Sequence, residues 1–345
     1  MGARMSVLCS ISTRGRYDTT LPMAIQSILM QTRKPDKLII FDDNEHPVDV
    51  REKPIYQYLF MMLQESGINW EWAFAEKKGQ HFNHQRANKM GFEWVWRMDD
   101  DTVAEPNVLE KLMAQTGDRI GAVGGSILTP PFPKGLHATG KIEDIYTEPN
   151  LQWDYIKETR DVDHLHCSFV YRANIVDYNL GLSRIAHREE TLFTYGLKLK
   201  GYRVLLTPCI TWHMKNREGG IRDGVREMFE HDEKIFQEFI KMKDKTVVVL
   251  DNGLGDHIVF KHVIKDIKNP IVFSCWPEII PGRSIQEAKN TLGDIERYNV
   301  YVKMDEWNWK GSLEDAFRKL YNVEKPKQTL AEYLNSNVPP VNNHV

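Results

Sequence analysis

Three consecutive aspartates, Asp99 to Asp101, follow Arg97-Met98 and the apolar run Gly91–Trp96. A buried strand that ends in three carboxylates concentrates negative charge at one point, and like charges repel unless a cation neutralises them. Mg²⁺ and Mn²⁺ prefer such oxygen ligands and often bind together with a phosphate group. The aspartate triplet therefore predicts a divalent metal site, with a solvated acidic turn as the alternative interpretation.

Alternating strand and helix signals lie around the triplet. Strands are predicted over Ser6–Ile11, Lys37–Phe41 and Asn69–Ala75, and helices over Leu21–Gln31, Tyr56–Glu65 and Gln85–Phe92. This rhythm predicts an α/β fold with a mostly parallel sheet and helices on both faces. Ligands of such sheets bind beyond the carboxyl ends of the strands. The polar clusters Ser12–Arg14, Asp42–Asn44 and Asp99–Asp101 follow three predicted strands, so we expect them to share one site.

The composition is that of an ordinary globular protein with room for two domains. The chain has 345 residues, of which 41% are hydrophobic and 27% are charged, and its formal net charge is -3. No overall basic excess indicates a nucleic-acid partner, although a local basic groove remains open. The sequence contains no run of about 18 apolar residues and no secretory segment, so neither a membrane span nor export is expected.

The cysteine pattern points to a reducing compartment. Four cysteines are widely scattered, at positions Cys9, Cys167, Cys209 and Cys275. No CxxC pair is present, so the pattern favours neither a zinc site nor a disulfide framework. A cytoplasmic location is therefore expected, which would be the host cytoplasm if the protein is viral.

Composition shifts predict the domain boundaries. We expect a first domain over residues 5–220, a charged helical connector over 221–244, a small α/β module over 245–325 and a flexible tail over 326–345. In the irregular middle region, strands are predicted at Gly121–Gly125, His166–Tyr171 and Tyr202–Leu206, and a helix from Arg188 to Gly201. In the small module, the strands are Thr246–Leu250, Ile271–Phe273 and Val300–Val302, with helices over Ile258–Lys268 and Leu313–Tyr321.

Seven short motifs in a fixed order carry a resemblance to a known family. They are Ser12-Thr13-Arg14-Gly15-Arg16, Ser27-Ile28-Leu29-Met30-Gln31-Thr32, Asp42-Asp43-Asn44, Arg86-Ala87-Asn88-Lys89-Met90-Gly91, Asp99-Asp100-Asp101, Arg188-Glu189-Glu190 with Gly201-Tyr202-Arg203, and Trp212-His213. With these motifs, residues 6 to about 215 resemble the GT-A-type glycosyltransferases of family 2. The resemblance implies the GT-A nucleotide-diphospho-sugar transferase fold. It also implies transfer of a sugar from a nucleotide-diphosphate donor, foremost a UDP-sugar, to an acceptor hydroxyl with inversion.

The resemblance implies a divalent ion, Mn²⁺ or Mg²⁺, in this site. Asp99 and Asp101 are the implied ligands, with His213 as a third, and a core histidine beside Trp212 is the alternative interpretation of His213. Asp100 is expected to contact the ribose or the sugar of the donor. Such an ion stabilises the negative charge that grows on a leaving diphosphate.

Further residues of the motifs are implied donor contacts. Asp43 would accept a hydrogen bond from the edge of a uracil-type base, and Thr13 and Arg86 would frame the nucleotide. Arg14 or Arg16 would contact phosphate, because a guanidinium matches it with two hydrogen bonds. An ordinary solvated arginine pair is the alternative for these two residues.

The pair Glu189-Glu190 occupies the family's position for the general base, which takes the proton from the acceptor hydroxyl. We favour Glu190, with Glu189 as the alternative. Many relatives carry Glu-Asp here, and glutamate reaches one methylene further, so the sequence leaves the choice of base open. Carboxylates at a helix N-terminus are also favourable for purely structural reasons.

A second, shorter resemblance lies in the C-terminal module. The segment Leu250–His257 contains Gly253-Leu254-Gly255-Asp256 after a predicted strand, and it is similar to the first turn of heptosyltransferase-like GT-B domains. Glycine permits a close backbone approach to an anion at a helix N-terminus. Only about 80 residues remain for this module. We therefore expect half of a GT-B architecture that serves acceptor binding or self-association into a homo-oligomer, with a second catalytic centre and a purely structural glycine turn as the alternatives.

The sequence is also compatible with two other functions. A sugar-phosphate nucleotidyltransferase would use a similar sheet and metal site, but it usually carries a glycine-rich loop after the first strand, where this chain has Ser12-Thr13-Arg14-Gly15-Arg16. A non-catalytic sugar-nucleotide-binding protein is the other alternative. The sequence leaves the acceptor undetermined among a glycan, a small molecule, a protein and a modified DNA base. The last is suggested by analogy with viral DNA-modifying transferases.

Overall fold

The computed structural model describes residues 5–129, 138–215, 220 and 226–243, together with the backbone of three strands at 246–250, 270–277 and 297–302. The chain divides into two compact units, Met1–Phe236 and Gln237–Val345. Each unit contains its own sheet. The candidate site residues named above all belong to the first unit.

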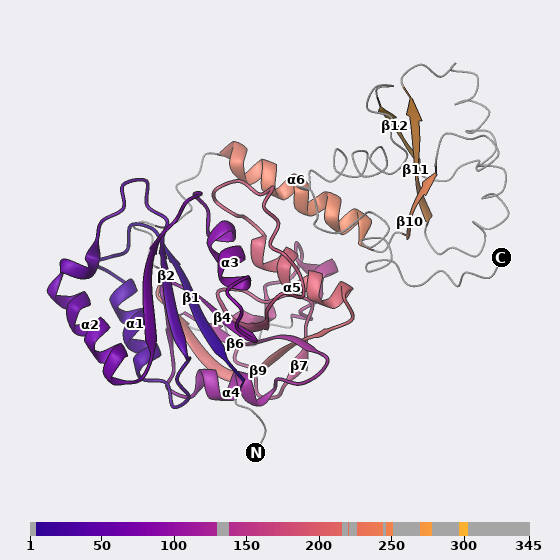
Figure 1. The fold of residues 1–345 in the computed structure, drawn as a ribbon. Helices are drawn as coiled ribbons and strands as arrows, with labels where there is room; N and C mark the ends of the chain where they lie inside the picture. Colours follow the sequence, from indigo (N-terminus) through magenta and orange to yellow (C-terminus); the bar gives the residue numbers. More distant parts are fainter. Residues whose placement is uncertain are drawn as a thin grey trace. The chain divides into compact units, whose positions relative to one another are not determined.

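The sheet of the first unit follows the order β3-β2-β1-β4-β8-β6-β9-β5, and β7 pairs with β9 (Figure 1). The strands are β1 (Val7–Thr13), β2 (Lys37–Asp42), β3 (Asn69–Phe74), β4 (Trp94–Asp99), β5 (Thr102–Ala104), β6 (Ile120–Leu128), β7 (Arg160–Asp161), β8 (Ser168–Arg172) and β9 (Arg203–His213). Strands β1, β2, β3, β4, β6 and β9 run in one direction, while β5, β7 and β8 run antiparallel to their neighbours. The predicted α/β architecture with a mostly parallel sheet and helices on both faces is confirmed, while the GT-A assignment stays a prediction.

Helices cover both faces of this sheet (Figure 1). The helices on the two faces are α1 (Leu21–Leu29), α2 (Pro54–Glu65), α3 (Gln80–Asn88), α4 (Val108–Ala114) and α5 (Glu189–Leu199). Helix α6 (Arg226–Met242) comes next along the chain. Single-turn helices are η1 (Val50–Glu52), η2 (Ile142–Asp144) and η3 (Leu151–Trp153). Proline lies in the first turn of α1 and of α2, where its fixed backbone angle suits a helix start.

Alternating side chains of the central strands build two cores. In β1, Val7, Cys9 and Ile11 belong to the core beneath α1, α2 and α4, whereas Leu8 belongs to the core beneath α3 and α5. The strands are apolar on both sides because helices cover both faces. On the α3 and α5 face of β4, the position of one apolar residue is taken by the fully buried Arg97.

Most predicted elements of the first unit are present, and two of them differ clearly from the prediction in their bounds. The predicted helix Gln85–Phe92 is wrong in its bounds, since α3 begins at Gln80 and ends at Asn88. Strand β9 runs as far as His213, well beyond the predicted Leu206, because β5 and β6 both provide partners for its second half. Helix α6 lies within the helical connector predicted over 221–244, and residues 221–225 are outside the described residues.

The second unit contains a parallel three-stranded sheet, β10 (Thr246–Leu250), β11 (Pro270–Pro277) and β12 (Arg297–Val302). The three strands predicted there are confirmed. The glycine turn at 252–257, the two helices predicted in this module and the tail lie outside the described residues. The domain boundaries expected at residues 220, 244 and 325 stay a prediction.

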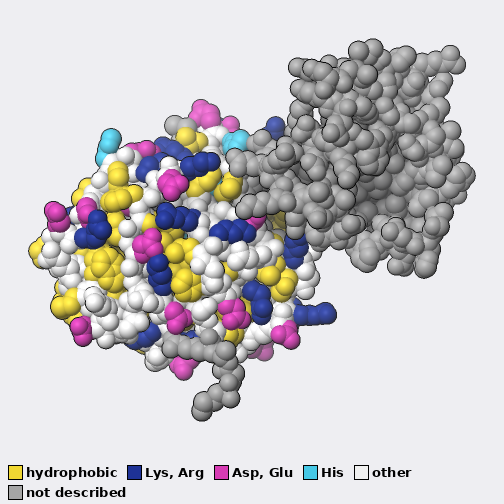
Figure 2. Space-filling view, in the orientation of Figure 1, with side chains coloured by type: hydrophobic (Ala, Val, Ile, Leu, Met, Phe, Trp, Pro, Cys, Tyr) yellow, Lys and Arg dark blue, Asp and Glu magenta, His cyan; other side chains and the backbone are white. Residues whose placement is uncertain are grey.

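The described surface carries both signs of charge. On the face drawn in Figure 2, basic and acidic side chains are interspersed among apolar ones. Among the described helices, none has the length and apolar character needed to cross a membrane. Cys9, Cys167 and Cys209 are buried free thiols.

Candidate active site

The predicted polar clusters meet at one edge of the sheet. Thr13 ends β1, Asp42 ends β2 and Asp99 ends β4, and the parallel register sets Thr13 opposite Asp42 and Ser12 opposite Asp99. Because these strands are parallel, their carboxyl ends open on the same side, where α/β proteins bind ligands.

Arg16 neutralises two of the three aspartates. Its guanidinium pairs with Asp100, and its Nη1 lies 3.1 Å from Asp101 Oδ2. Thr13 Oγ1 donates to Asp100 Oδ2 at 2.7 Å, and the backbone N–H of Arg14 points to the same oxygen at 3.3 Å. Burial raises the pKa of Asp100, while the charge of Arg16 opposes that rise. The cation that the acidic triplet requires is therefore supplied in part by the chain itself.

Asp101 and His213 form the second part of the site. Thr102 in β5 pairs with His213 in β9, and this register sets the imidazole Nε2 3.6 Å from Asp101 Oδ1. The ring of His213 also stacks on Trp153, with 6.1 Å between ring centroids. A carboxylate oxygen and an imidazole nitrogen form a donor set that suits Mn²⁺.

The tautomer of His213 sets a condition on metal binding. Its Nδ1 accepts a hydrogen bond from the backbone N–H of Lys215 at 3.0 Å, which assigns the ring proton to Nε2. A metal ion would need the lone pair of Nε2. Asp101 and His213 therefore fit a divalent ion once the ring gives up its contact with Lys215.

Arg97 holds the third part of the site together. Its Nη1 lies 2.5 Å from Glu190 Oε1 and 3.2 Å from Asp99 Oδ1, and its Nη2 lies 3.4 Å from Glu189 Oε2. The guanidinium also lies over the ring of Phe169, with 5.7 Å to the ring centroid. One buried cation thus joins the end of β4 to the start of α5.

The two glutamates at the start of α5 differ in charge state. Burial raises the pKa of Glu189, although Arg97 opposes the rise. Burial acts in the same direction on Glu190, but Arg97, His166 and the N–H of Cys167 together outweigh it and lower its pKa. Glu190 is therefore the ionised member of the pair, held by the N–H of Cys167 at 2.8 Å and by His166 Nδ1 at 3.3 Å.

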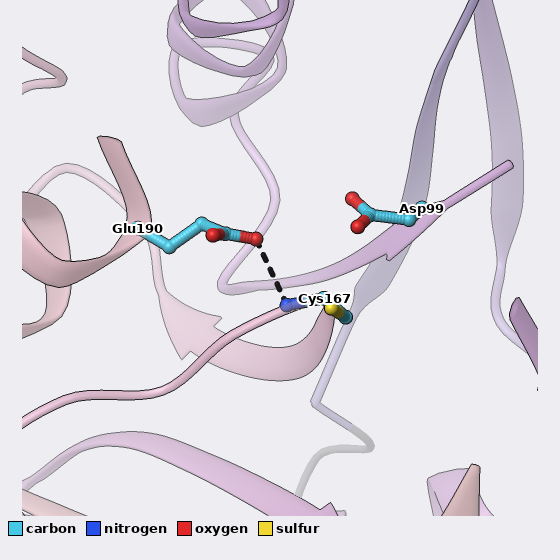
Figure 3. Close-up of side chains that lie close together, drawn as sticks. All are labelled: Asp99, Cys167 and Glu190. Atoms are coloured by element: carbon cyan, nitrogen blue, oxygen red, sulfur yellow. Dashed lines mark hydrogen bonds between the residues drawn. The ribbon is translucent and has the colours of Figure 1, made fainter. Parts of the chain in front are cut away.

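Asp99, Cys167 and Glu190 form a group of three potential metal ligands within the described residues, with donor atoms inside 4.8 Å of one another. Figure 3 shows the carboxylates of Asp99 and Glu190 directed toward each other with Cys167 between them. Arg97 Nη1 lies within hydrogen-bonding distance of both carboxylates, so the guanidinium already neutralises part of their negative charge. Arg16 likewise pairs with Asp101, but its side chain is partly exposed whereas that of Arg97 is fully buried. Arg16 can therefore leave its carboxylate more easily, and we favour Asp101 and His213 for an ion. Asp99 is turned toward Arg97.

The predicted donor contacts Asp43 and Arg14 lie on the β2 side. Asp43 is buried and accepts hydrogen bonds from the N–H of Gly79 at 2.9 Å and from Asn83 Nδ2 at 3.1 Å. Burial raises the pKa of Asp43 against these two hydrogen bonds. Arg14 pairs with Glu45 at 3.0 Å. Arg86, by contrast, lies beside Phe41 and Glu71, at 5.5 Å from the Phe41 ring centroid and 3.8 Å from a Glu71 oxygen.

The sequence motifs assign no catalytic or binding role to three residues that contact the site acids in the structure: Arg97, His166 and Gln80. Gln80 Nε2 donates to Glu189 Oε2 at 2.6 Å, and His166 pairs with Glu190. A signal for Arg97 was present, because an arginine at an inward position of an apolar strand requires buried acidic partners. Gln80 lies in a polar stretch and His166 at the edge of a predicted strand, so neither carried a comparable signal.

No protein-family model matches the chain, and no curated protein matches its sequence. One similar solved structure is GalNAc-T7 with UDP, GalNAc and Mn²⁺, at 13% identity and a TM-score of 0.48, covering 61% of this chain and 43% of that chain. Another is S. aureus TarS 1–349 in complex with UDP-GlcNAc, at 13% identity and a TM-score of 0.47, covering 66% and 64%. The full TarS structure from S. aureus has 14% identity and a TM-score of 0.43, covering 61% and 36%.

The aligned part of this chain spans less than two thirds of each of these three neighbours. Identities of 13–14% and TM-scores below 0.5 leave the function to be argued from the side chains of this chain.

Proposed function

We propose that this protein is a metal-dependent glycosyltransferase. It transfers a sugar from a nucleotide-diphosphate donor, foremost a UDP-sugar, to an acceptor hydroxyl with inversion at the anomeric carbon. The C1–O bond to the diphosphate breaks as the acceptor oxygen bonds to C1, and the hydroxyl proton passes to a carboxylate of the enzyme.

The division of the acidic triplet carries this proposal. Asp101 faces Arg16 and His213, whereas Asp99 faces Arg97 and the glutamates of α5. A diphosphate needs cationic partners, and an acceptor hydroxyl needs a carboxylate base close by. Asp101 lies in the cationic environment that a diphosphate needs, and Asp99 lies beside the carboxylates that could act as a base. A solvated acidic turn would not require this division.

The base in this proposal is Glu190. It is ionised because Arg97 and His166 lower its pKa, whereas burial favours the protonated form of Glu189. Only an ionised carboxylate can accept the proton of the hydroxyl. Glu189, tied to Gln80 and Arg97, then positions its neighbour.

The donor contacts follow from the same geometry. Asp101 and His213 would hold Mn²⁺ or Mg²⁺, which stabilises a leaving diphosphate as a Lewis acid. Arg16 is placed to exchange Asp100 for a phosphate, and a guanidinium matches phosphate well. We propose that Asp43 and Thr13 contact the nucleoside with Asp100. Framing of the nucleotide by Arg86 stays a prediction, since Arg86 lies beside Phe41 and Glu71.

Release of nucleoside diphosphate from a panel of UDP- and GDP-sugars tests the proposal. We expect UDP release that requires Mn²⁺ or Mg²⁺, disappears in excess EDTA and returns when the ion is restored. Asp101→Ala should abolish it, while Asp118→Ala, at an exposed aspartate in a turn, should retain it. Pyrophosphate release from a nucleoside triphosphate and a sugar phosphate would instead indicate a nucleotidyltransferase and would overturn the proposal.

The role of Glu190 needs a separate measurement. Glu190→Gln should lower kcat by about 10²–10⁴-fold, the usual contribution of a general base. The donor KM should change little, because the glutamine keeps the size of the side chain. Glu65→Gln, at an exposed position that ends α2, is the matched control. A kcat within threefold of wild type in Glu190→Gln would assign the base elsewhere.

A further inference from the structure

The segment 150–160 connects the two halves of the candidate site. Gln152 exchanges two hydrogen bonds with the backbone of His166: its Nε2 donates to the carbonyl at 3.1 Å, and its Oε1 accepts from the N–H at 2.6 Å. The next residue, Trp153, stacks on His213. The segment therefore touches the partner of Glu190 on one side and the partner of Asp101 on the other.

Trp153 offers an aromatic surface at this position. The side chain is only partly buried, and its ring lies at an angle of 30° to the ring of His213. Partly exposed tryptophans supply a large flat contact area with one polar N–H. A pyranose has a complementary shape, because one face of the ring presents C–H groups while the hydroxyls project from its rim.

An open cavity of about 450 Å³ is lined mainly by residues of the same segment, next to Trp153 in the chain but without Trp153 in its lining. Its lining includes Leu151, Asp154, Tyr155, Lys157 and Arg160. This volume lies within the range of roughly 300–1,000 Å³ that is usual for small-molecule sites. Tyr155 is 54% exposed, so a second aromatic ring is available beside groups that donate and accept hydrogen bonds. The cavity does not include the carboxylate cluster, so it is separate from the place proposed for the donor.

The charges of the segment argue for a neutral ligand. Asp154 and Glu158 are acidic, Lys157 and Arg160 are basic, and the four charges cancel. Arg160 is moreover paired with Glu158 at 3.0 Å. A nucleic acid would require a net positive surface to replace the counterions of its phosphates. A saccharide without charge needs only aromatic faces and hydrogen-bonding groups.

We propose that Trp153 and the Tyr155-lined cavity form the acceptor subsite, and that the acceptor is a neutral saccharide. This inference rests on the proposed glycosyltransferase function and names the acceptor class for it. The ring of a sugar unit stacks on the face of Trp153 that His213 leaves open, and the neighbouring Gln152 ties this position to the backbone of His166, the partner of Glu190. Tyr155 and the polar residues of the cavity hold the next unit.

Saturation-transfer NMR on the full chain tests the subsite without relying on turnover. The probes are the methyl glycosides of glucose, galactose and N-acetylglucosamine and two neutral disaccharides, with a short DNA duplex as the charged competitor. At least one saccharide should receive saturation from wild type. Trp153→Ala and Tyr155→Ala should each weaken its binding by roughly tenfold, whereas Tyr58→Ala, an equally exposed tyrosine on α2, should not.

Calorimetry with UDP and Mn²⁺ on the same samples separates the two proposals. Nucleotide binding without any saccharide binding would overturn the subsite and leave the proposed function standing. Saccharide binding that depends on Trp153, without nucleotide binding, would overturn the proposed function and with it the acceptor role, and would leave a saccharide-binding site at Trp153. Equal saccharide affinity in wild type and in both aromatic variants, or preferential binding of the duplex, would refute the subsite.

Where transfer is observed, the kinetics provide a second readout. Trp153→Ala should raise the KM for the saccharide acceptor, and this fold-increase should be roughly ten times the fold-increase in the KM for the donor. Trp153→Phe should recover much of the acceptor KM because it restores an aromatic face. A rise confined to the donor KM would place Trp153 with His213 in the donor site and would contradict the subsite.

Discussion

At the scale of single residues, Arg97 determines how the acids around it ionise. Its side chain is fully buried and contacts Asp99, Glu189 and Glu190. Arg97 opposes the effect of burial on all three acids, and only for Glu190 do Arg97, His166 and the N–H of Cys167 together outweigh burial and lower the pKa. Removing one partner of a buried ion pair leaves an uncompensated charge, which destabilises the fold by more than the intact pair stabilises it. The stability of the protein is therefore sensitive to the loss of any one of these residues.

Replacing Arg97 should destabilise the fold strongly. Arg97→Met keeps most of the side-chain volume but leaves the carboxylates without their cation, and we expect a loss of about 3–5 kcal/mol in the free energy of unfolding. Urea denaturation at pH 7 measures it. Arg226→Met, at a side chain that is 88% exposed, should change stability by less than about 1 kcal/mol. A small effect at Arg97 would show that the acids are already protonated.

The buried histidine His81 predicts a pH dependence of stability. Burial lowers its pKa from an ordinary 6.5 to about 4, and its ring nitrogens have no hydrogen-bond partner among the described residues. Between pH 6.5 and 4 the unfolded chain therefore binds a proton that the folded chain does not. Stability should fall across this window as the pH is lowered, by roughly 3 kcal/mol from this residue.

A comparison of variants isolates that contribution. Unfolding free energies of wild type and His81→Phe, measured by urea denaturation at pH 7 and pH 4.5, should differ in their change with pH, with the smaller change in the variant. His46→Phe, at an exposed position, should follow wild type. Identical pH slopes in wild type and His81→Phe would mean that His81 is already solvated in the folded protein.

Sequence motifs identify the acidic residues of the site but not the basic residue that pairs with them. Asp99 to Asp101 and Glu189-Glu190 were recognised from motifs, and the structure sets Asp99 close to Glu190. The position of Arg97 in an apolar strand indicates that it needs buried acidic partners but not which ones, because its contacts reach residues 70 and 93 positions further along the chain. Local patterns do not encode such distant pairings. They are decided by the sheet order, which runs from β4 to the non-consecutive strand β8.

At the scale of elements, the pairing of β6 with β9 positions His213. A shift in register lies between Gly125 and Ser126, where the two backbones approach closely. A Cβ atom on Gly125 would lie 2.3 Å from Cys209 Sγ and 2.8 Å from the Cys209 carbonyl oxygen. The second half of β9, which ends at His213, can therefore reach Asp101 only if residue 125 has no side chain.

Gly125→Ala should accordingly disturb both stability and the site. We expect a loss of about 1–3 kcal/mol from the overpacked contact and a weaker affinity for Mn²⁺ in the presence of UDP. Thermal unfolding and calorimetry provide the two measurements. Gly117→Ala, where the nearest atom would be 3.9 Å from the new Cβ, is the matched control. An unchanged metal affinity in a folded Gly125→Ala protein would separate this contact from the position of His213.

Helix α3 shows why one boundary was wrong. Its sequence, Gln80 to Asn88, is almost entirely polar, so hydrophobic spacing gave no signal for the first turn. Four of its polar side chains, His81, Asn83, His84 and Asn88, are nevertheless buried. Asn83 donates to Ser12 and Asp43, and His84 pairs with Ser10. Helices usually bury an apolar stripe, and a helix that buries polar groups beside a site escapes pattern reasoning.

At the scale of the whole molecule, the division into two units suggests where function resides. All candidate site residues belong to Met1–Phe236. Helix α6 is tied to that unit, because Asp232 accepts hydrogen bonds from the N–H groups of Ser183 and His187 at 2.6 Å and 2.8 Å. We propose that the smaller unit serves acceptor binding or self-association, as its sequence suggested.

Removal of residues 244–345 tests this assignment. The truncated chain keeps the anchored part of α6, and its affinity for UDP with Mn²⁺ should remain within about threefold of the full chain. Sedimentation of both proteins would reveal whether self-association is lost. A more than tenfold loss of nucleotide affinity in a folded truncated protein would show that the smaller unit contributes to the donor site.

The bridges from Arg16 to Asp100 and Asp101 have a consequence for the order of ligand addition. An incoming dication is repelled by the guanidinium as long as that group remains on Asp101, so the metal alone should bind weakly. A diphosphate gives Arg16 another partner, and each ligand should then raise the affinity of the other by the same factor. Titration of Mn²⁺ with and without UDP would measure this reciprocity, which Arg16→Gln should diminish.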